Sequence, residues 1–401
     1  MQKFRTFSLL LAFSLLFSLA GPGAQALEEP ERLSAQAVLL ADLDSGLVLY
    51  ERNADQQRSP ASLTKIMTIL LALEAAERGE VSLDDPVTAG PDCRSGMRDD
   101  SSSVGIRAGE QMSLRDLLYC AAVASGNDAC NVIAAYLAGS IPGFVERMNE
   151  RAAELGCSQT HFVDPNGLSY DDLTSARDLY LITREALSHP AFRELCDTRA
   201  YTVPATNQQG ERQLKSSNAL ICPDGFYGAG YLYEGAHGVK TGYTRAAGYC
   251  LISTAERDGM RLLAIVLGCD GPLLSGGEEY RNFSDTIRLY DWAFAHFSRR
   301  SLLQPELPAA QAEIAFALGD PRVGLLPVDG LSLPLPDEIP PGSEDLRIQL
   351  FDGNLIAPVR AGEVLGQAQL YRDGTLLATV LLVADRSVPR CYWDYIAHFA
   401  F

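Results

Sequence analysis

The chain has 401 residues, more than the roughly 100–200 of one typical domain, so we expect two domains. Its net charge of −18 argues against nucleic acid as a partner, because phosphate contacts need clustered Lys and Arg residues and none occur. The nine cysteines include no CxxC pair and the five histidines have no ligand spacing, so we expect no metal ion and no other cofactor. Most cysteines lie in apolar runs, which favours buried thiols over disulfides.

The first residues have the pattern of an export signal. Lys3 and Arg5 precede an apolar run at residues 7–20, and a small-x-small cleavage sequence follows at 24–26. The run is shorter than the ~20 residues that span a membrane, which favours cleavage over an uncleaved anchor. We therefore expect residues 1–26 to be a signal peptide and the mature protein to be exported.

Strand and helix patterns alternate through the next part of the chain. Residues 35–55 predict two strands joined by a turn, and a helix with Ser62 at its N-terminus follows. Further helical patterns cover 113–124, 127–139, 141–156 and 175–187, strands return at 237–244 and in a hairpin at 247–269, and a helix closes the block at 277–297. Strands at both ends with helices between them predict an α+β domain with one antiparallel sheet over residues 27–298.

The last hundred residues have a different sequence pattern. Short β-like runs are cut by Pro and Gly turns, which predicts a small all-β domain at 299–390. In the tail, 391–401, four apolar or aromatic side chains share one helical face, which indicates an amphipathic helix in peripheral contact with a membrane. The alternative is a final helix packed on the β domain.

A serine and a lysine stand three residues apart in "SPASLTKIMT". Residues i and i+3 share a helix face, so Ser62 and Lys65 can bring Oγ and Nζ within hydrogen-bonding reach. A neutral amine could take the hydroxyl proton, provided that burial or a second cation lowers the pKa of the lysine. Taken alone the pattern is common, with Ser62 as a helix cap and Lys65 as a solvated charge.

Two more motifs change this interpretation. Ser125-Gly126-Asn127 lies at a break between two predicted helices, where a cap with a tight turn is the ordinary explanation. Lys240-Thr241-Gly242 lies on a predicted strand, where an edge lysine and a glycine bulge would be ordinary. The order SxxK, SGN, KTG behind an export signal is typical of the active-site serine penicillin-recognising enzymes.

The chain resembles the low-molecular-weight penicillin-binding proteins that act as D-alanyl-D-alanine carboxypeptidases. The likeness covers nearly all of it, through "SPASLTKIMT", "SGNDA", "HFVDPNGL", "TSARDL", "GVKTGYTRAAGYCL", "DWAF" and the β-rich tail domain. The resemblance implies a peptidase that trims peptidoglycan stem peptides ending in D-Ala-D-Ala and takes β-lactams as covalent inhibitors. It also implies an extracytoplasmic location, at the outer face of the cytoplasmic membrane or in the cell wall.

The resemblance implies roles for the residues of the first two motifs. Ser62 would attack the carbonyl between the two terminal D-alanines and Lys65 would accept its proton, after which water would hydrolyse the acyl-enzyme. Ser125 would relay a proton to the leaving amine, and Asn127 would hold the substrate's peptide backbone.

The third motif would bind the substrate. Lys240 would add positive charge, which keeps Lys65 neutral and attracts a carboxylate, and Thr241 would hydrogen-bond that carboxylate. Gly242 would let the substrate lie against the strand as an added β-strand. The oxyanion hole would be the backbone N–H groups of Ser62 and Tyr243, each such donor being worth about 3 kcal/mol in the barrier.

Two departures leave alternatives open. Some relatives place an arginine ahead of KTG to bind the terminal carboxylate, and here the matching position is Ser217, with Lys215 nearby. D,D-endopeptidase activity is therefore an alternative. The chain lacks a candidate for a dedicated deacylating glutamate, and Arg177 and Asp178 are expected to form a structural ion pair, so β-lactamase activity should be weak. An alternative of another class is a catalytically inactive peptidoglycan-binding envelope protein.

Overall fold

The computed structural model describes residues 29, 30, 32–276, 278–338, 340, 345–372 and 374–391. The predicted signal peptide, 1–26, lies outside the described residues, as does the predicted terminal helix beyond residue 391. The chain divides into two compact units, one at Glu29–Ala295 and one at His296–Phe401.

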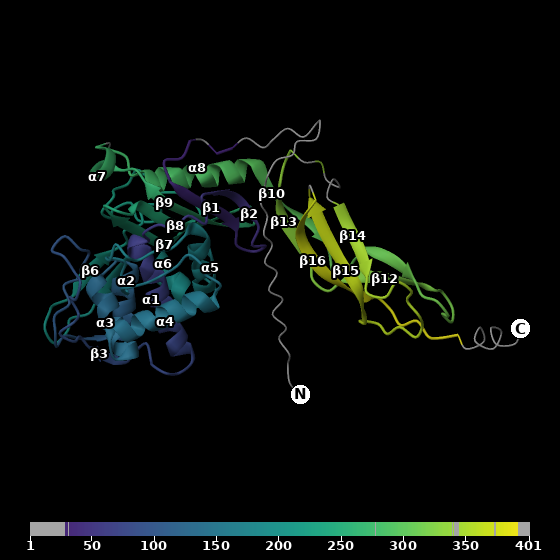
Figure 1. Ribbon diagram of the computed structural model, residues 1–401, viewed down its shortest axis with the longest axis horizontal. Coiled ribbons are helices and arrows are strands. Elements are labelled where there is room, and N and C mark those ends of the chain that lie inside the picture. Colours follow the sequence, from purple (N-terminus) through teal and green to yellow (C-terminus); the bar gives the residue numbers. More distant parts are fainter. Residues whose placement is uncertain are drawn as a thin grey trace, which may run out of the picture. The chain divides into compact units, whose positions relative to one another are not determined.

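The first unit is built on a five-stranded antiparallel sheet (Figure 1). The strand order is β2 (Val48–Arg52), β1 (Ala37–Asp42), β9 (Met260–Cys269), β8 (Gly248–Arg257), β7 (Ala236–Thr244). Both predicted hairpins are present, as the β1–β2 and β8–β9 pairs. The three middle strands are apolar along most of their length because helices cover both faces of the sheet.

Helices form a layer on each side of this sheet (Figure 1). One face carries α8 (Arg281–His296), whose Trp292 meets Tyr50 of β2 edge to face at 5.9 Å. The other face carries the helical block, namely η1 (Ala61–Thr64), α1 (Lys65–Glu77), α2 (Leu114–Ala122), α3 (Asn127–Ala138), α4 (Ile141–Glu154), α5 (Ala176–Ala186) and α6 (Pro190–Asp197). The short helix α7 (Pro272–Ser275) follows β9.

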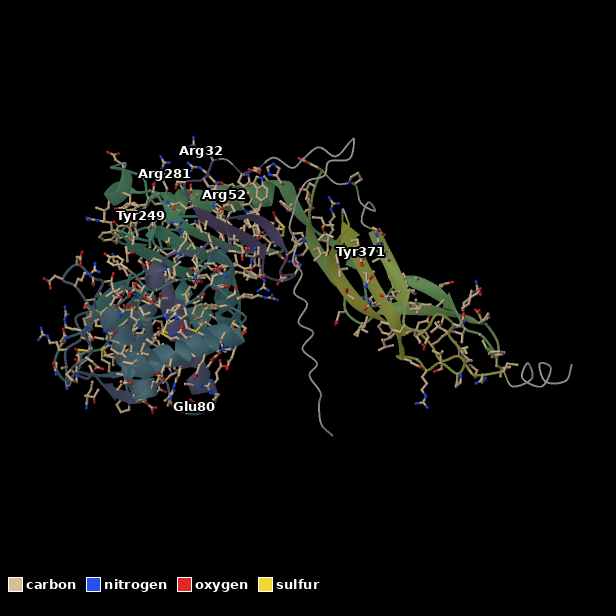
Figure 2. All side chains as sticks on the ribbon, viewed as in Figure 1. Arg32, Arg52, Glu80, Tyr249, Arg281 and Tyr371 are labelled. Atoms are coloured by element: carbon tan, nitrogen blue, oxygen red, sulfur yellow. The ribbon has the colours of Figure 1, made fainter. Side chains whose placement is uncertain are left out.

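The core of the first unit surrounds α1. Nine of the 13 residues of this helix are buried, so it is apolar on almost all sides, as a helix enclosed by sheet and helices must be. Each buried Leu, Ile or Met contributes roughly 1.5–3 kcal/mol relative to an exposed position. Side chains fill the space between the sheet and the helical block (Figure 2). This packing fixes the start of α1, where the serine and lysine stand.

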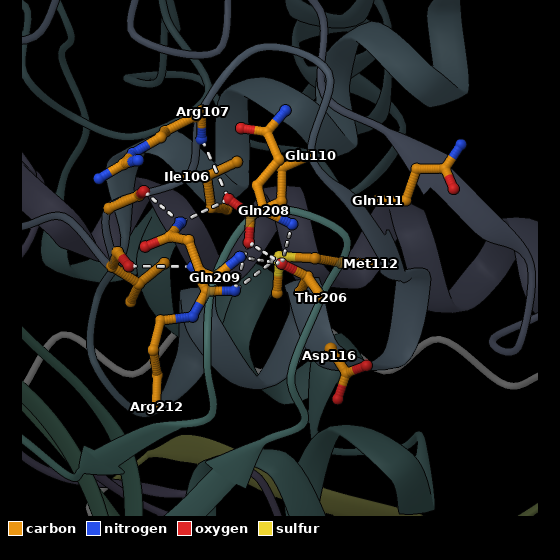
Figure 3. Close-up of polar contacts among 12 residues, drawn as sticks. Ile106, Arg107, Glu110, Gln111, Met112, Asp116, Thr206, Gln208, Gln209 and Arg212 are labelled. Atoms are coloured by element: carbon orange, nitrogen blue, oxygen red, sulfur yellow. Dashed lines mark hydrogen bonds and ion pairs between the residues drawn. The ribbon is translucent and has the colours of Figure 1, made fainter.

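Two small hairpins complete the unit, β3 (Pro86–Thr88) with β4 (Gln111–Ser113) and β5 (Ala200–Val203) with β6 (Arg212–Lys215). They are joined by Glu110, which is 1% exposed (Figure 3). Its carboxylate accepts hydrogen bonds from Arg212 (2.8 Å), Thr206 (2.9 Å) and Gln209 (2.6 Å). Such a fully satisfied buried carboxylate holds the two hairpins in one arrangement.

The second unit is all β. A five-stranded sheet has the order β11 (Ala310–Glu313), β12 (Arg322–Pro327), β16 (Thr375–Ala384), β15 (Val364–Arg372), β14 (Asp345–Leu350), and β10 (Phe297–Leu303) pairs with β13 (Leu331–Pro336). It has its own hydrophobic core, which includes Val323, Leu325 and Leu382. The predicted fold class, α+β with an antiparallel sheet followed by a small all-β domain, is confirmed.

Among the described residues no single helix is long and apolar enough to cross a membrane; α3 and α4 meet that criterion only as a pair, bent by 85°.

Candidate active site

Ser62 stands in a short 3₁₀ turn rather than in the α-helix itself. The predicted helix begins as η1, and α1 starts at Lys65. Residues i and i+3 eclipse in a 3₁₀ turn, so Ser62 and Lys65 lie more directly above one another than in an α-helix. Ala61 has φ 48°, a left-handed conformation that is rare for alanine and stores of order 1–3 kcal/mol of strain.

Two glycines allow other segments to close around this turn. A Cβ at Gly167, where φ is 83°, would lie 1.8 Å from the carbonyl oxygen of Ala61. A Cβ at Gly242 of β7 would lie 3.1 Å from the carbonyl oxygen of Pro60 and 3.3 Å from the Ala61 Cβ. In the structure Gly242 lets β7 pack against the turn that carries Ser62, and its role in letting substrate lie along the strand stays a prediction.

Lys65 meets Ser62 directly. Its Nζ donates to Ser62 Oγ at 2.7 Å and to the carbonyl oxygen of Asn166 at 2.7 Å. Lys65 is 0% exposed, and burial lowers its pKa because desolvation disfavours the charged form. A buried amine beside a hydroxyl can be neutral and take the serine proton.

The second motif lies at the junction of α2 and α3. Ser125 has φ 57° and is buried, and Asn127 is the first residue of α3. Asn127 is 1% exposed, and its Oδ1 has no hydrogen-bond partner among the described residues. An unpaired buried polar atom costs about 1–3 kcal/mol. A substrate N–H that reaches Oδ1 would recover that energy.

The third motif is linked to the second through Ser217. The hydroxyls of Ser217 and Thr241 lie 2.6 Å apart, and the Ser217 N–H donates to the carbonyl of Val123 at 3.3 Å. Val123 stands two residues before Ser125, so the chain ahead of β7 holds both motifs in one arrangement.

The second lysine is also buried. Lys240 is 2% exposed, and its Nζ donates to the carbonyl oxygen of Thr241 at 3.1 Å. Burial first, and then the charge of Lys65, lower the pKa of Lys240 to about 7. Two amines in one dry site cannot both hold a proton cheaply, so each favours the neutral form of the other.

Tyr243 ends the site at the far side of the KTG triplet. Its ring packs on that of Tyr249, tilted by 32° with the centroids 4.3 Å apart, and Figure 2 labels Tyr249. This ring contact holds the end of β7, whose Tyr243 N–H is the predicted oxyanion donor.

The neighbouring charged groups are structural. Lys215 pairs with exposed Asp224 at 2.8 Å, which directs its ammonium group to that carboxylate. Arg177 pairs with Glu51 at 2.9 Å, while Asp178 accepts from the Gln159 N–H at 2.7 Å. These contacts anchor the loops around the site.

A cluster of possible metal ligands lies on the helical block. Glu74, Glu185 and His189 offer ligand atoms within 4.8 Å of one another. Arg151 donates to both carboxylates at 2.7 Å, so its guanidinium already offsets part of their charge. This is the geometry of an ion-pair network.

Sequence reasoning missed the role of the loop that includes Asn166. Its carbonyl holds Lys65, and the neighbouring carbonyl of Pro165 accepts from Thr68 at 2.6 Å, so the loop is fixed to two turns of α1. The composition of "DPNG" is typical of a turn, but a backbone carbonyl leaves no signature in side-chain chemistry.

A family profile described as D-alanyl-D-alanine carboxypeptidase matches residues 24–271, more than half of the chain. The chain belongs to this peptidase family. A second profile, the C-terminal domain of penicillin-binding protein 5, matches residues 319–390 in the all-β unit of this D-alanyl-D-alanine carboxypeptidase family member.

Known members of the family are similar over most of the chain. The D-alanyl-D-alanine carboxypeptidase DacF of Bacillus subtilis (strain 168) is 31% identical, covering 96% of this chain and 95% of its own. Penicillin-binding protein 5 from Haemophilus influenzae is 27% identical with a TM-score of 0.72, covering 90% of this chain and 100% of its own. Penicillin-binding protein D2 from Listeria monocytogenes, solved in an ampicillin-bound form, is 31% identical with a TM-score of 0.55, covering 66% and 100%.

Proposed function

We propose that this protein removes the terminal D-alanine from peptidoglycan stem peptides through an acyl-enzyme on Ser62. The observation that carries the proposal is the 2.7 Å hydrogen bond from the fully buried Nζ of Lys65 to the Oγ of Ser62, which is itself partly exposed. A serine alone is a weak nucleophile, and this contact supplies its base.

In the acylation step, Ser62 Oγ attacks the carbonyl carbon between the two D-alanines while its proton passes to Lys65 Nζ. The oxyanion that forms is stabilised by the backbone N–H groups of Ser62 and Tyr243, and loss of one such donor costs about 3 kcal/mol in the barrier. The intermediate then collapses, the C–N bond breaks and the acyl group stays on Ser62. The leaving D-alanine amine takes a proton through the Ser125 hydroxyl.

Water completes the cycle. It attacks the ester on Ser62, transfers a proton toward Lys65, and the ester bond to Oγ breaks to give the shortened peptide and free serine. Among the described residues, no hydrogen bond joins a glutamate to Ser62 or Lys65, so deacylation has no second base at this position. A β-lactam, whose leaving group stays attached, therefore remains on Ser62 for a long time.

The substrate lies along β7 in this proposal. Asn127 Oδ1, which lacks a partner, accepts a substrate N–H, and the terminal carboxylate meets Lys240 and the paired hydroxyls of Thr241 and Ser217. Hydrogen bonds to a carboxylate are stronger than those between neutral groups, so this set favours a substrate with a free C-terminus.

We further place the enzyme outside the cytoplasm, on the proposed export signal at 1–26 and the cell-wall substrate of the family. A peripheral membrane contact through residues 391–401 belongs to the same proposal. Deleting these residues and fractionating cells tests it, and unchanged recovery in the membrane fraction contradicts the contact.

The central test is release of D-alanine from a muramyl pentapeptide that ends in D-Ala-D-Ala. We expect release by the protein spanning residues 27–401 and none by its Ser62→Ala variant, with a penicillin adduct at Ser62 of the first. Release by neither protein, with no adduct, would leave an inactive peptidoglycan-binding protein.

Ser217 favours a second candidate activity. A pair of hydroxyls binds a carboxylate without the positive charge of an arginine. The site should therefore prefer a free C-terminal carboxylate less strongly, and cross-linked peptides that lack this carboxylate can compete as substrates. Hydrolysis of a cross-linked muropeptide dimer at a rate similar to pentapeptide hydrolysis would establish D,D-endopeptidase activity on the same site.

A further inference from the structure

The loop that holds Lys65 contains two acidic side chains close together. It runs from Val163 to Asp172 and is closed by the backbone pairing of His161 with Leu173. Asp172 is 0% exposed, and Asn166, whose carbonyl contacts Lys65, lies between Asp164 and Asp172 in the sequence. The charges of these two aspartates therefore affect Lys65, the proposed base of the reaction.

Asp164 organises the loop as an acceptor. Its carboxylate receives backbone N–H groups from four successive residues, Asn166 (2.8 Å), Gly167 (2.5 Å), Leu168 (3.1 Å) and Ser169 (2.7 Å). These bonds set the turn that points the Asn166 carbonyl at Lys65.

Asp172 has a different environment. Its Oδ1 accepts the N–H groups of Val163 at 2.7 Å and Asp164 at 3.4 Å, while its buried Oδ2 has no hydrogen-bond partner among the described residues. The N–H contact puts Asp164 directly beside this carboxyl group, and the carboxyl group of Asp164 interacts with it. Burial first, and then the charge of Asp164, raise the pKa of Asp172 to about 8. A proton on Oδ2 would turn the unpaired acceptor into a donor.

We propose that Asp172 is a positioning residue: in its neutral form it donates a hydrogen bond to Asp164 and so keeps the Asn166 carbonyl on Lys65. The inference rests on the proposed function, because it concerns the base that activates Ser62. No covalent bond changes; the only exchange is one proton between Asp172 and solvent.

The hydrogen bond from Lys65 to the Asn166 carbonyl orients the amine when Lys65 is neutral. Neutral Lys65 has two N–H groups and one lone pair, and a carbonyl that takes an N–H turns the lone pair toward Ser62. An ionised Asp172 would place a second negative charge beside Asp164 in a buried site, and the two would repel. It would also raise the pKa of Lys65, because the charge of Asp172 favours the ammonium form. Both effects slow acylation and leave substrate binding largely unchanged.

Other titratable groups surround Lys65 and contribute to any pH profile. Cys130 and Asp128 of α3 interact with it from one side, and Lys240 of β7 interacts from another. The pKa of Lys240 is lowered to about 7, so a fall in rate on the alkaline side does not by itself identify Asp172. A comparison between variants does.

The experiment measures acylation by a fluorescent penicillin across neutral and alkaline pH for three full-length proteins. Asp172→Asn keeps a neutral donor toward Asp164 that does not titrate, and Asp171→Asn is the matched control because Asp171 is the exposed neighbour. In the wild type, loss of one essential proton from Asp172 should slow acylation about tenfold per pH unit above its pKa. We therefore expect the acylation rate of Asp172→Asn, divided by that of the wild type, to rise by about tenfold per pH unit in that range. That pKa is about 8, and the half-saturating penicillin concentration stays the same. Asp171→Asn follows the wild type throughout.

Two results would overturn the proposal: an Asp172→Asn profile that parallels the wild type, or a variant that is slower by the same factor at every pH. If Asp172→Asn does not fold, a ¹³C NMR titration of the aspartate carboxyl groups in the wild type decides. The proposal requires one buried carboxyl that is protonated at neutral pH and titrates at about 8. Absence of acylation in the wild type refutes the proposed function instead, and the titration still tests Asp172.

Discussion

Burial, rather than ion pairing, sets the charge of the two buried lysines, Lys65 and Lys240. The lowered pKa of Lys240, about 7, has desolvation as its main cause, with Lys65 second. The unfolded chain therefore binds more protons than the folded one between about pH 7 and the ordinary lysine pKa of 10.5, and stability rises with pH across that window. The site is thus a place where function lowers stability.

This leads to a first expectation. Lys240→Met removes the buried amine with little change in volume, so we expect a higher melting temperature at neutral pH together with loss of D-alanine release. The gain should shrink as the pH rises to 10.5 and beyond, because the wild-type lysine then approaches the neutral form in the unfolded as well as the folded state. Thermal melts of both proteins at a series of pH values measure it. A gain that is constant with pH would show that packing, not charge, is responsible.

Ser217 gives a second expectation, which concerns selectivity. Ser217→Arg places a guanidinium beside Thr241, where it can bind a carboxylate bidentately. We expect the ratio of pentapeptide to cross-linked dimer hydrolysis to rise about tenfold or more, since a charged hydrogen bond contributes roughly 1.5–3 kcal/mol. Parallel kinetics on the two substrates give the ratio, and Lys215→Arg, at an exposed neighbour, is the control. An unchanged ratio would remove Ser217 from carboxylate recognition.

At the scale of elements, the 3₁₀ turn at Ala61–Thr64 is held between β7 and the Asn166 loop. Only glycine permits the approach at Gly167, and a Cβ at Gly242 would be crowded by the turn. The turn is short and strained, so its position depends on its neighbours more than on its own sequence.

Gly167→Ala tests this dependence. Its Cβ would collide with the Ala61 carbonyl oxygen, so we expect acylation at Ser62 to fall by at least about a hundredfold, as a small displacement of reacting groups can do. Gly156→Ala is the matched control, because Gly156 has a similar φ of 81° with nothing within 4 Å of the added Cβ. That control should lose only about 1 kcal/mol of stability and keep its acylation rate. Equal acylation rates in the two variants would contradict the account.

Glu110 supports a second expectation at this scale. Glu110→Gln leaves the Arg212 guanidinium without its buried counter-charge, so we expect a loss of about 3 kcal/mol in the free energy of unfolding. Urea denaturation measures the loss. The exposed pair Arg78–Glu80 provides the comparison, and Glu80→Gln should change little. A small effect at Glu110 would mean that its neutral hydrogen bonds, not the ion pair, join the hairpins.

The amount that sequence could reveal differs between elements and contacts. The β1–β2 and β8–β9 hairpins, the longer helices and the three motifs follow from periodicity and spacing, because these patterns are local, whereas α6 and the β3–β4 and β5–β6 pairs were not predicted. The bond from Lys65 to Asn166 spans 101 residues, and the Ser217–Thr241 and Asp164–Asp172 contacts arise only after the chain folds. Local patterns also could not show that α1 starts three residues after Ser62, since the cause is packing by Gly167 and Gly242.

At the scale of the whole molecule, the two units have separate hydrophobic cores. A ligand that binds to one unit, covalently or not, stabilises that unit and leaves the stability of the other unit unchanged. We expect penicillin acylation of the full chain to slow hydrogen exchange in β7 and α1 and to leave β15 and β16 as they were. Mass spectrometry of exchanged peptides measures both, with Ser62→Ala as the control. Equal protection of both units would show that they unfold together.

Because of the nine cysteines, it matters whether the chain folds before or after it meets an oxidant. All nine are free, and seven are buried. Burial raises the pKa of Cys130 and Cys196 to about 12, so these two thiols hold hardly any thiolate at neutral pH. Oxidants act on thiolates, so a chain that folds while reduced is shielded from them. In a chain that meets an oxidant before it folds, any of the nine thiols can instead form a non-native disulfide. Rapid folding then protects the chain from such disulfides.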